Sequence, residues 1–355
     1  MGYSKPIVGV IALSFLALAL SGCLFPEDAI FLTVAGGRAM VDGLGTTMSG
    51  FVGWEPYPSE AVVKGRGKIL MNSSEIWPHH PCCVLVYRDN WFKDNEDAGE
   101  IVKRVVWAHM QAQNWINEAK GGGNYTELVK YAGIFTHREE EVVKLALDNV
   151  DYDYTLDIEG IKEYGNGIYD KTAIINSKKW KASGYESMDD YIDDVVDESF
   201  IDSNYDPGLN LTKKGVKIGF ITDDLHHLPL QIIRDVGFDR KVNISITTDD
   251  RSNGVGVMMD LIKNGEVDMA YLGIAPALIH GINSNDFSSI SGEFNDAKIE
   301  IVAGVNYNGS AIVVEEGINN LEDLVGKTVG YPGEGTVQWY LILKAVEKEK
   351  LKIST

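Results

Sequence analysis

Cysteine and basic residues are both scarce in this chain of 355 residues. Its three cysteines, Cys23, Cys82 and Cys83, are too few for the disulfide framework that stabilises small exported domains. Lys and Arg together number 32 against 52 Asp and Glu, which gives a formal net charge of −20. Nucleic-acid-binding surfaces need clustered Lys and Arg, so this balance argues against that class of partner. The sequence also has no G-x-x-x-x-G-K-[ST] loop, and we expect no ATP chemistry in it.

The apolar stretch near the N-terminus is too short to span a membrane. From Pro6 to Leu20 it has about 15 residues, whereas a transmembrane helix needs roughly 20. Lys5 precedes the stretch and Ser21-Gly22-Cys23 follows it, as in a signal peptide. The segment resembles a lipobox, so we expect residues 1–22 to be removed and Cys23 to anchor the protein by a lipid on the outer face of the cytoplasmic membrane. An ordinary cleaved signal and an uncleaved anchor are the alternatives.

The rest of the chain is long enough for two domains, since about 330 residues remain and a domain typically has 100 to 200. Apolar residues make up 45% and charged residues 24%, as in an ordinary globular protein. From residue 215 onward, short β-rich runs alternate with helical periods, which predicts an α/β region with a largely parallel sheet. Strands are predicted at 216–222, 242–247, 267–272, 299–305, 311–314 and 327–331. Helices are predicted at 228–235, 255–263, 321–324 and 336–350, and another begins near Pro276.

The first half of the chain is also mixed, but its elements come in another order. Strands are predicted at 50–54, 68–71 and 83–87. A long helix is predicted at 99–119 from one apolar stripe, and shorter helices at 139–147 and 188–200. The turn-rich stretch 202–212 predicts a linker.

Several motifs together resemble one family. They are Gly265-Glu266-Val267-Asp268-Met269-Ala270-Tyr271-Leu272-Gly273, Asn308-Gly309-Ser310, Leu321-Glu322-Asp323-Leu324, Gly53-Trp54-Glu55-Pro56-Tyr57 and Trp77-Pro78-His79-His80-Pro81-Cys82-Cys83. The family is that of the solute-binding proteins of nitrate, sulfonate and taurine importers, related to thiamine-precursor-binding proteins (the NMT1/THI5-like group). The resemblance implies a two-lobed periplasmic-binding-protein-like α/β fold of type II. Each lobe would have a mixed sheet flanked by helices, with the ligand cleft between the lobes. It also implies a small-molecule ligand, an ABC permease with its ATPase as partners, no cofactor and no catalysis.

The order of the motifs departs from the family, because the segment that comes late there precedes the early one here. We therefore expect a circularly permuted chain. Its parts would be a second-lobe-like region with the family's C-terminal helices at 23–203, a linker at 204–214, a first-lobe-like region at 215–314 and the start of the second lobe at 315–355. Permutation is tolerable because termini often lie close together on a domain surface. A rearranged gene that has lost part of the second lobe would show the same order, and residues 30–49 match the family poorly.

Glycine-rich turns before helices are the first candidates for ligand contact, because unpaired N–H groups at helix N-termini favour anions. Gly333, Gly335 and Thr336 form the best of them, with Thr336 as the cap of the predicted helix. We expect an anion nest there, in which Glu334 is unfavourable for a bare oxyanion. Two further turns, with Asn253 and Gly254 in one and Gly273 and Ala275 in the other, precede predicted helices at strand ends, where such sheets bind ligands. An ordinary strand-to-helix turn is the alternative for each.

Polar and aromatic residues from the remaining motifs complete the predicted site. His226 or His227 follows a strand and can donate to a ligand oxygen, and by the resemblance their loop and Asn308 line the cleft. Trp54, Glu55, Tyr57 and Trp77 can form the other wall, because aromatic rings pack against ligand bodies. Local hydrogen bonding of the histidines and core packing of the tryptophans are the alternatives.

The run from His79 to Cys83 has the composition of a metal site, but we expect no metal there. Adjacent strand residues point to opposite faces and should not reach one ion, whereas neighbouring cysteines in an apolar strand are usually buried filler. The same pair is only faintly similar to the cysteine-rich motif of the fungal thiamine-pyrimidine enzymes in the family, so an enzyme is an unfavoured alternative. A rearranged, non-functional remnant and an extracytoplasmic ligand sensor are the others.

Overall fold

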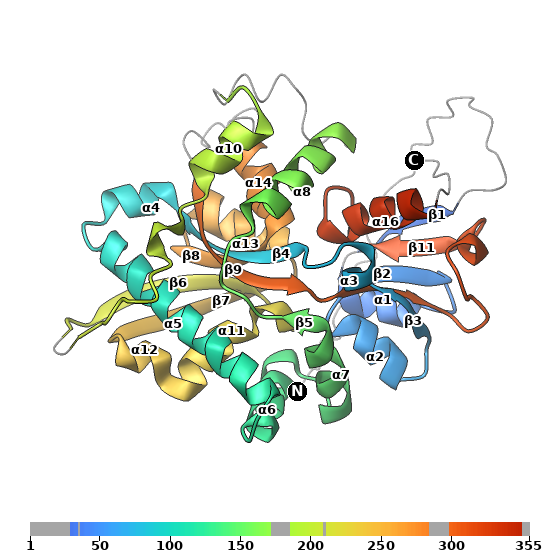
Figure 1. Ribbon diagram of the computed structural model, residues 1–355, viewed down its shortest axis with the longest axis horizontal. Helices are drawn as coiled ribbons and strands as arrows, with labels where there is room; N and C mark the ends of the chain where they lie inside the picture. The colour runs from blue at the N-terminus through green and yellow to red at the C-terminus, as the bar shows by residue number, and fades with distance from the viewer. Residues whose placement is uncertain (1–28, 35, 172–184, 209–210, 284–297, 350–355) are drawn as a thin grey trace, which may run out of the picture.

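The computed structural model describes residues 29–34, 36–171, 185–208, 211–283 and 298–349, which contain a five-stranded and a six-stranded sheet (Figure 1). Helices surround both sheets, and we call the five-stranded sheet with its helices the small lobe and the six-stranded sheet with its helices the large lobe. The predicted two-lobed α/β arrangement is confirmed. The expected signal peptide and Cys23 lie outside the described residues. Within the described ranges, no helix has both the length and the apolar character needed to cross a bilayer.

The small lobe takes residues from both ends of the described chain. Its strand order is β1-β11-β2-β10-β3, in which β1 and β11 are parallel and β10 is antiparallel to both neighbours. The strands are β1 (Ile30–Thr33), β2 (Gly50–Trp54), β3 (Lys68–Asn72), β10 (Ser310–Val314) and β11 (Thr328–Tyr331). The helices are α1 (Gly37–Gly43), α2 (Tyr57–Val63), α3 (Ser73–Ile76), η6 (Glu322–Leu324) and α16 (Val337–Lys348).

The large lobe has the strand order β5-β9-β4-β8-β6-β7, with β6 parallel to β7 and β8 and the other pairs antiparallel. Its strands are β4 (Pro81–Arg88), β5 (Val150–Asp151), β6 (Lys214–Ile221), β7 (Ile244–Arg251), β8 (Met269–Gly273) and β9 (Ile299–Asn308). Before β6 come the helices α4 (Asp89–Asp94), α5 (Ala98–Lys120), α6 (Tyr125–Thr136), α7 (Glu140–Asn149), α8 (Ile158–Lys171), α10 (Met188–Val195) and η1 (Glu198–Phe200). After β6 come η2 (Leu225–His227), α11 (Leu228–Ile232), η3 (Ile233–Gly237), α12 (Phe238–Lys241), α13 (Gly254–Met258), η4 (Met259–Asn264) and α14 (Ile274–Asn283).

Strands β1 and β11, from the two ends of the described chain, pair in parallel, and the circular permutation stays a prediction. β11, α16 and β1 have the layout of a βαβ unit that is open between α16 and β1. Residues 30–49 supply β1 and α1, and Met40 and Val41 of α1 are buried in the small lobe with Phe51 of β2. The expected boundary after residue 314 is displaced, because β10 already belongs to the small lobe. The region 23–203 is likewise divided, since β4 and the helices that follow it belong to the large lobe.

The central strand β4 shows how alternation builds the core of the large lobe. Leu85 and Tyr87 pack in a cluster with α5 and α11, whereas Val84 and Val86 pack in a second cluster with α8, α10 and α14. The predicted stripe of the long helix, now α5, is buried in the first of these clusters, apart from Trp115, which is half-buried. Helices cover both faces of this sheet (Figure 1).

Candidate functional site

Two chain connections run between the lobes and lie against each other. One leads from α3 through Trp77 and His80 into β4, and the other turns from β9 to β10 at Asn308 and Gly309. The φ angles of Asn308 and Gly309 are 56° and 84°, the left-handed region that a tight turn needs. The backbone N–H of Asn308 donates to the carbonyl oxygen of His80 over 3.1 Å. Side chains from both lobes gather around these crossings and form the candidate site.

Glu55, directly after β2, is the carboxylate that the small lobe contributes. Its side chain is fully buried and accepts from the amide Nδ2 of Asn149, in the large lobe, over 2.7 Å. It also accepts from the backbone N–H of Ser59 over 3.2 Å. Burial raises the pKa of Glu55, although both hydrogen bonds oppose the rise. The predicted site residue Glu55 is thus held between the lobes.

The carbonyl oxygen of Gly309 joins the two lobes at the second crossing. It accepts from the backbone N–H of Glu55 over 2.9 Å and from Nε2 of His226 over 3.0 Å. Since a carbonyl oxygen can only accept, Nε2 of His226 carries a proton. The carbonyl of Glu55 in turn accepts from the backbone N–H of Leu225, in η2, over 3.3 Å. The predicted residues Glu55 and His226 therefore meet at one backbone group.

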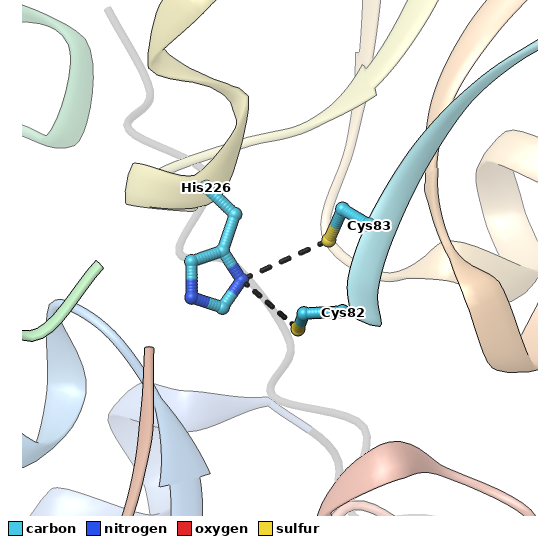
Figure 2. A group of neighbouring side chains, drawn as sticks. All are labelled: Cys82, Cys83 and His226. Carbon is cyan, nitrogen blue, oxygen red and sulfur yellow. Dashed lines mark hydrogen bonds between the residues drawn. The ribbon is translucent and has the colours of Figure 1, made fainter. Parts of the chain in front are cut away.

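The other ring nitrogen of His226 faces two sulfur atoms, as Figure 2 shows. Nδ1 lies 3.5 Å from Sγ of Cys82 and 3.7 Å from Sγ of Cys83. Both cysteines pack in the same core cluster, because irregular pairing of β4 with β9 interrupts the alternation at this point. The objection to a metal site, that adjacent residues must point to opposite faces, is therefore wrong for this pair.

Burial and close charges perturb the titrating groups of this cluster. The pKa of Cys82 is lowered by a hydrogen bond from Cys83 and by the nearby His226, whereas burial raises the pKa of Cys83. Burial alone would lower the pKa of His226, but the charges of Cys82 and Asp224 outweigh it and raise the pKa to about 9. Burial raises the pKa of Asp224 to about 7.

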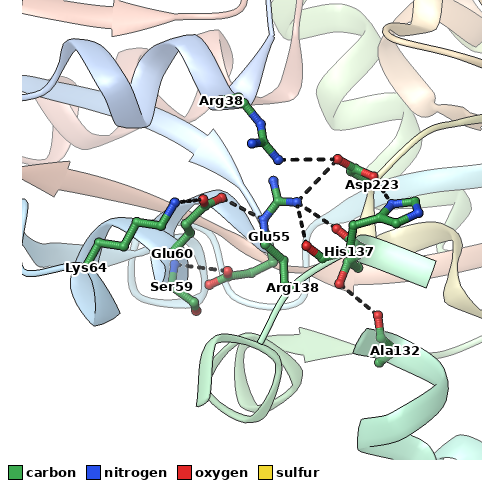
Figure 3. A network of polar contacts seen from close by, with 10 residues as sticks. Arg38, Glu55, Ser59, Glu60, Lys64, Ala132, His137, Arg138 and Asp223 are labelled. Atoms are coloured by element: carbon green, nitrogen blue, oxygen red, sulfur yellow. Dashed lines mark hydrogen bonds and ion pairs between the residues drawn. The ribbon is translucent and has the colours of Figure 1, made fainter. Parts of the chain in front are cut away.

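A second polar network connects the lobes beside Glu55 (Figure 3). Nε of Arg138, just after α6, donates to Glu60 of α2 over 2.7 Å, and its Nη1 lies 3.3 Å from Asp223. Asp223 also accepts from Nδ1 of His137 over 2.7 Å and lies 3.9 Å from Nη2 of Arg38, on α1. Arg138 is nearly completely buried, so its charge is compensated within the protein.

Two buried donors close to this network have no acceptor among the described residues. They are Nη2 of Arg138, from the large lobe, and Nε1 of Trp54, from the small lobe. Both residues contact the ring of Tyr57: the Trp54 ring meets it edge-on with centroids 5.4 Å apart, and the Arg138 guanidinium lies 5.3 Å from its centre. Most buried polar groups in proteins are hydrogen-bonded, so these donors mark a place where an acceptor can bind.

A cavity of about 240 Å³ lies next to the network, at the ends of β6 and β7. Asp223 and His137 line it together with the stacked rings of Phe135 and Phe220. Charged groups of both signs reach it, because Arg234 lines it as well. The carboxyl ends of parallel strands are the usual place for ligands in such sheets.

The turn before α16 folds as the sequence predicts. Oγ1 of Thr336 accepts from the backbone N–H of Trp339 over 3.2 Å and so caps the helix. Gly333 and Gly335 have φ of 139° and 75°, and Glu334 is exposed. The carbonyl oxygen of Gly335 accepts from the hydroxyl of Tyr164, on α8 of the large lobe, over 2.7 Å. The turn therefore contacts the other lobe, and its role in ligand binding stays a prediction.

The two turns near Asn253 and Gly273 lie together at the end of β8, where Gly273 pairs with Cys83 of β4. Asn253 is exposed and its Oδ1 accepts from the backbone N–H of Gly256 over 2.9 Å, within its own turn. A Cβ on Gly254 or on Gly273 would lie 3.4 Å or 3.3 Å from Pro276, so both glycines pack against one proline. Ala275 is buried in the core. These contacts are local, and ligand contact by these residues stays a prediction.

The remaining predicted residues occupy packed positions. Trp77 is buried and stacks on His80 and on Tyr164 of the large lobe. Nδ1 of His227 accepts from the backbone N–H of Ile221 over 3.1 Å, and its ring packs on Tyr271, so this histidine supports the turn after β6. Asn308 donates to Asp151 over 2.6 Å.

Sequence reasoning missed Arg138, Glu60 and Asn149. Arg138 lies between two helices in a stretch with no periodic signal, and Glu60 and Asn149 lie within helices. Each has a partner across the boundary between the lobes, many residues away in the chain. The positive charge of Arg138 in a largely acidic chain was the one feature of the sequence that could have pointed to this residue.

Known proteins match this chain to different extents. The sequence pattern of the NMT1-like family matches residues 16–131 and 210–350, more than half of the chain. The nitrate/nitrite binding protein NrtA of Nostoc sp. is 22% identical over 135 residues, which are 38% of this chain and 30% of that protein. Among solved structures, the PBP AgaA of A. tumefaciens R10 in complex with agropinic acid has 11% identity and a TM-score of 0.38, covering 91% of this chain and 60% of its own. The chain thus covers under a third of NrtA. The two-lobed architecture follows from the strand order of the two sheets.

Proposed function

Because the chain belongs to the NMT1-like family, we propose that it is a solute-binding protein that holds a small polar solute where its two lobes meet. In this proposal a lipid on Cys23 anchors the protein to the outer face of the cytoplasmic membrane, and an ABC-type permease with its ATPase accepts the solute. The named activity of NrtA, the binding of nitrate and nitrite, supports a small solute with an acidic group.

The pair of buried donors from opposite lobes is the observation that carries the proposal. Nη2 of Arg138 and Nε1 of Trp54 have no acceptor in the described part of the chain, and both residues contact the ring of Tyr57. A buried donor without an acceptor costs about 1–3 kcal/mol. An acidic group that accepts from both removes this cost and binds the two lobes to each other.

The surrounding charges narrow the class of solute. A guanidinium matches carboxylate, sulfonate and nitrate groups in size and geometry. Glu60 and Asp223 already compensate the charge of Arg138, however. Glu55 is a third carboxylate, which accepts a hydrogen bond from Asn149. A solute that carries an amine or another donor beside its acidic group, as taurine does, satisfies these carboxylates and fits better than a bare anion.

Contacts with both lobes give the solute a means of controlling closure. The ion pair of Arg138 with Glu60 forms only while the lobes are in contact, so a solute held beside it binds the closed arrangement more tightly than an open one. A ligand shifts such an equilibrium by its difference in affinity for the two states. The permease would then recognise the closed, loaded protein.

The first test is thermal unfolding of the chain with and without candidate solutes. Nitrate, bicarbonate, taurine, alkanesulfonates and thiamine precursors form the panel. A solute at 100 times its Kd stabilises the folded state by about 2.7 kcal/mol, so the correct class raises the midpoint. Arg138→Gln and Trp54→Phe each remove a donor and should reduce the shift. Arg66→Gln is the matched control, since Arg66 lies on the small lobe with Asp42 as its ion-pair partner.

Three outcomes contradict the proposal. A cooperative transition that no solute moves would leave the chain without the expected ligand class. A shift that survives in both Arg138→Gln and Trp54→Phe would place the solute elsewhere. A broad transition would show that the rearranged chain does not fold as one binding protein, as a remnant would behave.

A further inference from the structure

We propose that Cys82, Cys83 and His226 together bind one thiolate-preferring metal ion of the Zn²⁺ class. The three side chains are 3%, 4% and 1% exposed, and their ligand atoms lie within 4.8 Å of one another. The sequence predicts no metal here, and the solute proposal does not require one. The inference therefore stands or fails independently of solute binding.

The distances between the ligand atoms agree with a tetrahedral site. With Zn–S near 2.3 Å and Zn–N near 2.05 Å, tetrahedral angles place S and N about 3.6 Å apart. The observed separations from Nδ1 of His226 are 3.5 Å to Cys82 Sγ and 3.7 Å to Cys83 Sγ. An ion can therefore bind at this cluster with little movement of the side chains.

The backbone of β4 explains how two neighbouring cysteines can share one ion. The pairing of β4 with β9 shifts register between Pro81 and Cys83 and again between Cys83 and Val84. A bulge of this kind bends the strand and re-aims side chains, and such bulges are common next to functional sites. Figure 2 shows both sulfur atoms on the side of β4 that faces His226.

The hydrogen bond of His226 leaves its Nδ1 as the ring nitrogen that can bind a metal. Its Nε2 donates to the carbonyl oxygen of Gly309 over 3.0 Å, which leaves Nδ1 directed at the sulfur atoms. Metal-binding histidines usually donate their second ring N–H to a carbonyl or carboxylate, which fixes the ring orientation. Asp224 lies 3.5 Å from Nδ1 and accepts from the backbone N–H of His226, so it steadies the same residue.

Three protein ligands leave the fourth position to an exogenous donor, as in zinc sites that are not purely structural. His80 is fully buried beside the cluster and interacts electrostatically with Cys82 and His226. Its Nε2 has no hydrogen-bond partner among the described residues. The side chains of the cluster therefore offer nitrogen and sulfur atoms, which favours zinc over magnesium or calcium.

Another group of close ligand atoms shows the contrast. Asp249, Asp260 and Glu266 also approach one another, but Arg251 lies among them and forms ion pairs with all three. That acidic group already has its cation. Apart from the imidazole of His226 itself, which is one of the proposed ligands, the described contacts of Cys82 and Cys83 include no basic side chain comparable to Arg251.

The test uses the full chain with Cys23→Ala, so that Cys82 and Cys83 are its two thiols. The reduced, chelator-stripped protein is titrated with Zn²⁺ against a chromogenic chelator, and with Cd²⁺ to detect thiolate charge-transfer absorption. We expect one ion per chain and a thiolate band. Cys82→Ser, Cys83→Ser and His226→Gln should each weaken binding by more than the roughly 10- to 100-fold that loss of an outer-shell partner costs.

His79→Asn is the matched control. His79 is an exposed imidazole close to the cluster in sequence, and its φ of 55° is one that asparagine tolerates. Binding should be unchanged in this variant. If the cysteine variants fail to fold, X-ray absorption of the zinc-loaded parent decides the question by showing two sulfur ligands and nitrogen.

Several results would overturn the inference. They are an absorption spectrum without sulfur ligands, zinc affinity in the Cys82→Ser, Cys83→Ser double variant equal to that of the parent, or no binding to the reduced protein. In the last case, a mass lower by two hydrogens before reduction would assign the pair to a disulfide between neighbouring cysteines instead.

Discussion

Replacing Gly309 with alanine tests whether the second crossing between the lobes has the tight geometry described above. Gly309 has a φ of 84°, and a Cβ at this position would lie 2.3 Å from Nε2 of His226 and 3.1 Å from Cγ2 of Val150. The left-handed backbone costs an L-residue about 1–2 kcal/mol. The new methyl group also displaces His226, whose Nε2 bonds the Gly309 carbonyl.

The contact of the new methyl group with His226 should double or triple the loss of stability that the left-handed backbone causes alone. Loss of a bond to a buried acceptor costs about 1–3 kcal/mol, so Gly309→Ala should reduce the free energy of unfolding by about 2–5 kcal/mol. The φ of Gly309 lies between those of Gly45 and Gly317, which are 75° and 94°. A Cβ on Gly45 or Gly317 would meet nothing within 4 Å. Gly45→Ala and Gly317→Ala should therefore lose about 1–2 kcal/mol, the backbone part alone.

Urea unfolding of the metal-free chain gives the comparison, because a shift in midpoint at constant slope reports stability. Thermal unfolding provides a second readout. If Gly309→Ala loses no more stability than the two bracketing variants, the close approach of His226 to the crossing is wrong. The joining of the lobes through the Gly309 carbonyl would then be wrong as well.

Three further predictions concern single side chains. Burial lowers the pKa of His109 to about 4 from an ordinary 6.5, so stability is complete above pH 6.5 and falls by about 3 kcal/mol as the pH drops to 4; His109→Gln should remove this pH dependence when unfolding is measured across that window. Tyr164→Phe removes the bond to the Gly335 carbonyl and should cost about 1–2 kcal/mol in urea unfolding. Thr336→Ala removes the cap of α16 and should cost about 1 kcal/mol, whereas Thr336→Ser should cost less.

Each of these three has a result that contradicts it. An equal pH slope in the parent and in His109→Gln would mean that the native histidine titrates normally. If Tyr164→Phe leaves the stability unchanged, the hydrogen bond between Tyr164 of the large lobe and the turn before α16 does not stabilise the protein. Equal losses of stability in Thr336→Ala and Thr336→Ser would show that the Thr336 hydroxyl does not cap α16.

Much of the secondary structure could be predicted from local patterns. The predicted strand at 50–54 coincides with β2, and the long helix at 99–119 is α5 with a residue added at each end. The helix predicted at 188–200 ends at Val195, because Val196 forms a bridge to Ile301 of the large sheet. Helix α6 was missed, because its sequence mixes apolar residues with Gly, Tyr and Thr.

The candidate site was only partly predictable. Glu55 and His226 were expected from the motifs that contain them, and the structure brings both to the carbonyl of Gly309. Arg138 was not expected, because its importance comes from burial against Glu60 rather than from a pattern. Gly254, in the predicted turn at Asn253, packs against Pro276, and ligand contact by this turn stays a prediction.

The sequence by itself determined the α/β class, the family, most strands, the cap of α16 and the acidic charge of this protein. These properties depend on local periodicity, composition and short motifs, which fold in the same way wherever the segment lies. The tertiary structure alone decided which distant residues share a site. It paired β1 with β11 across the two ends of the described chain, placed Arg138 between Glu60 and Asp223, and turned Cys82 and Cys83 toward His226. Bulges, burial and contacts between lobes arise from packing over long sequence separations, and no local pattern records them.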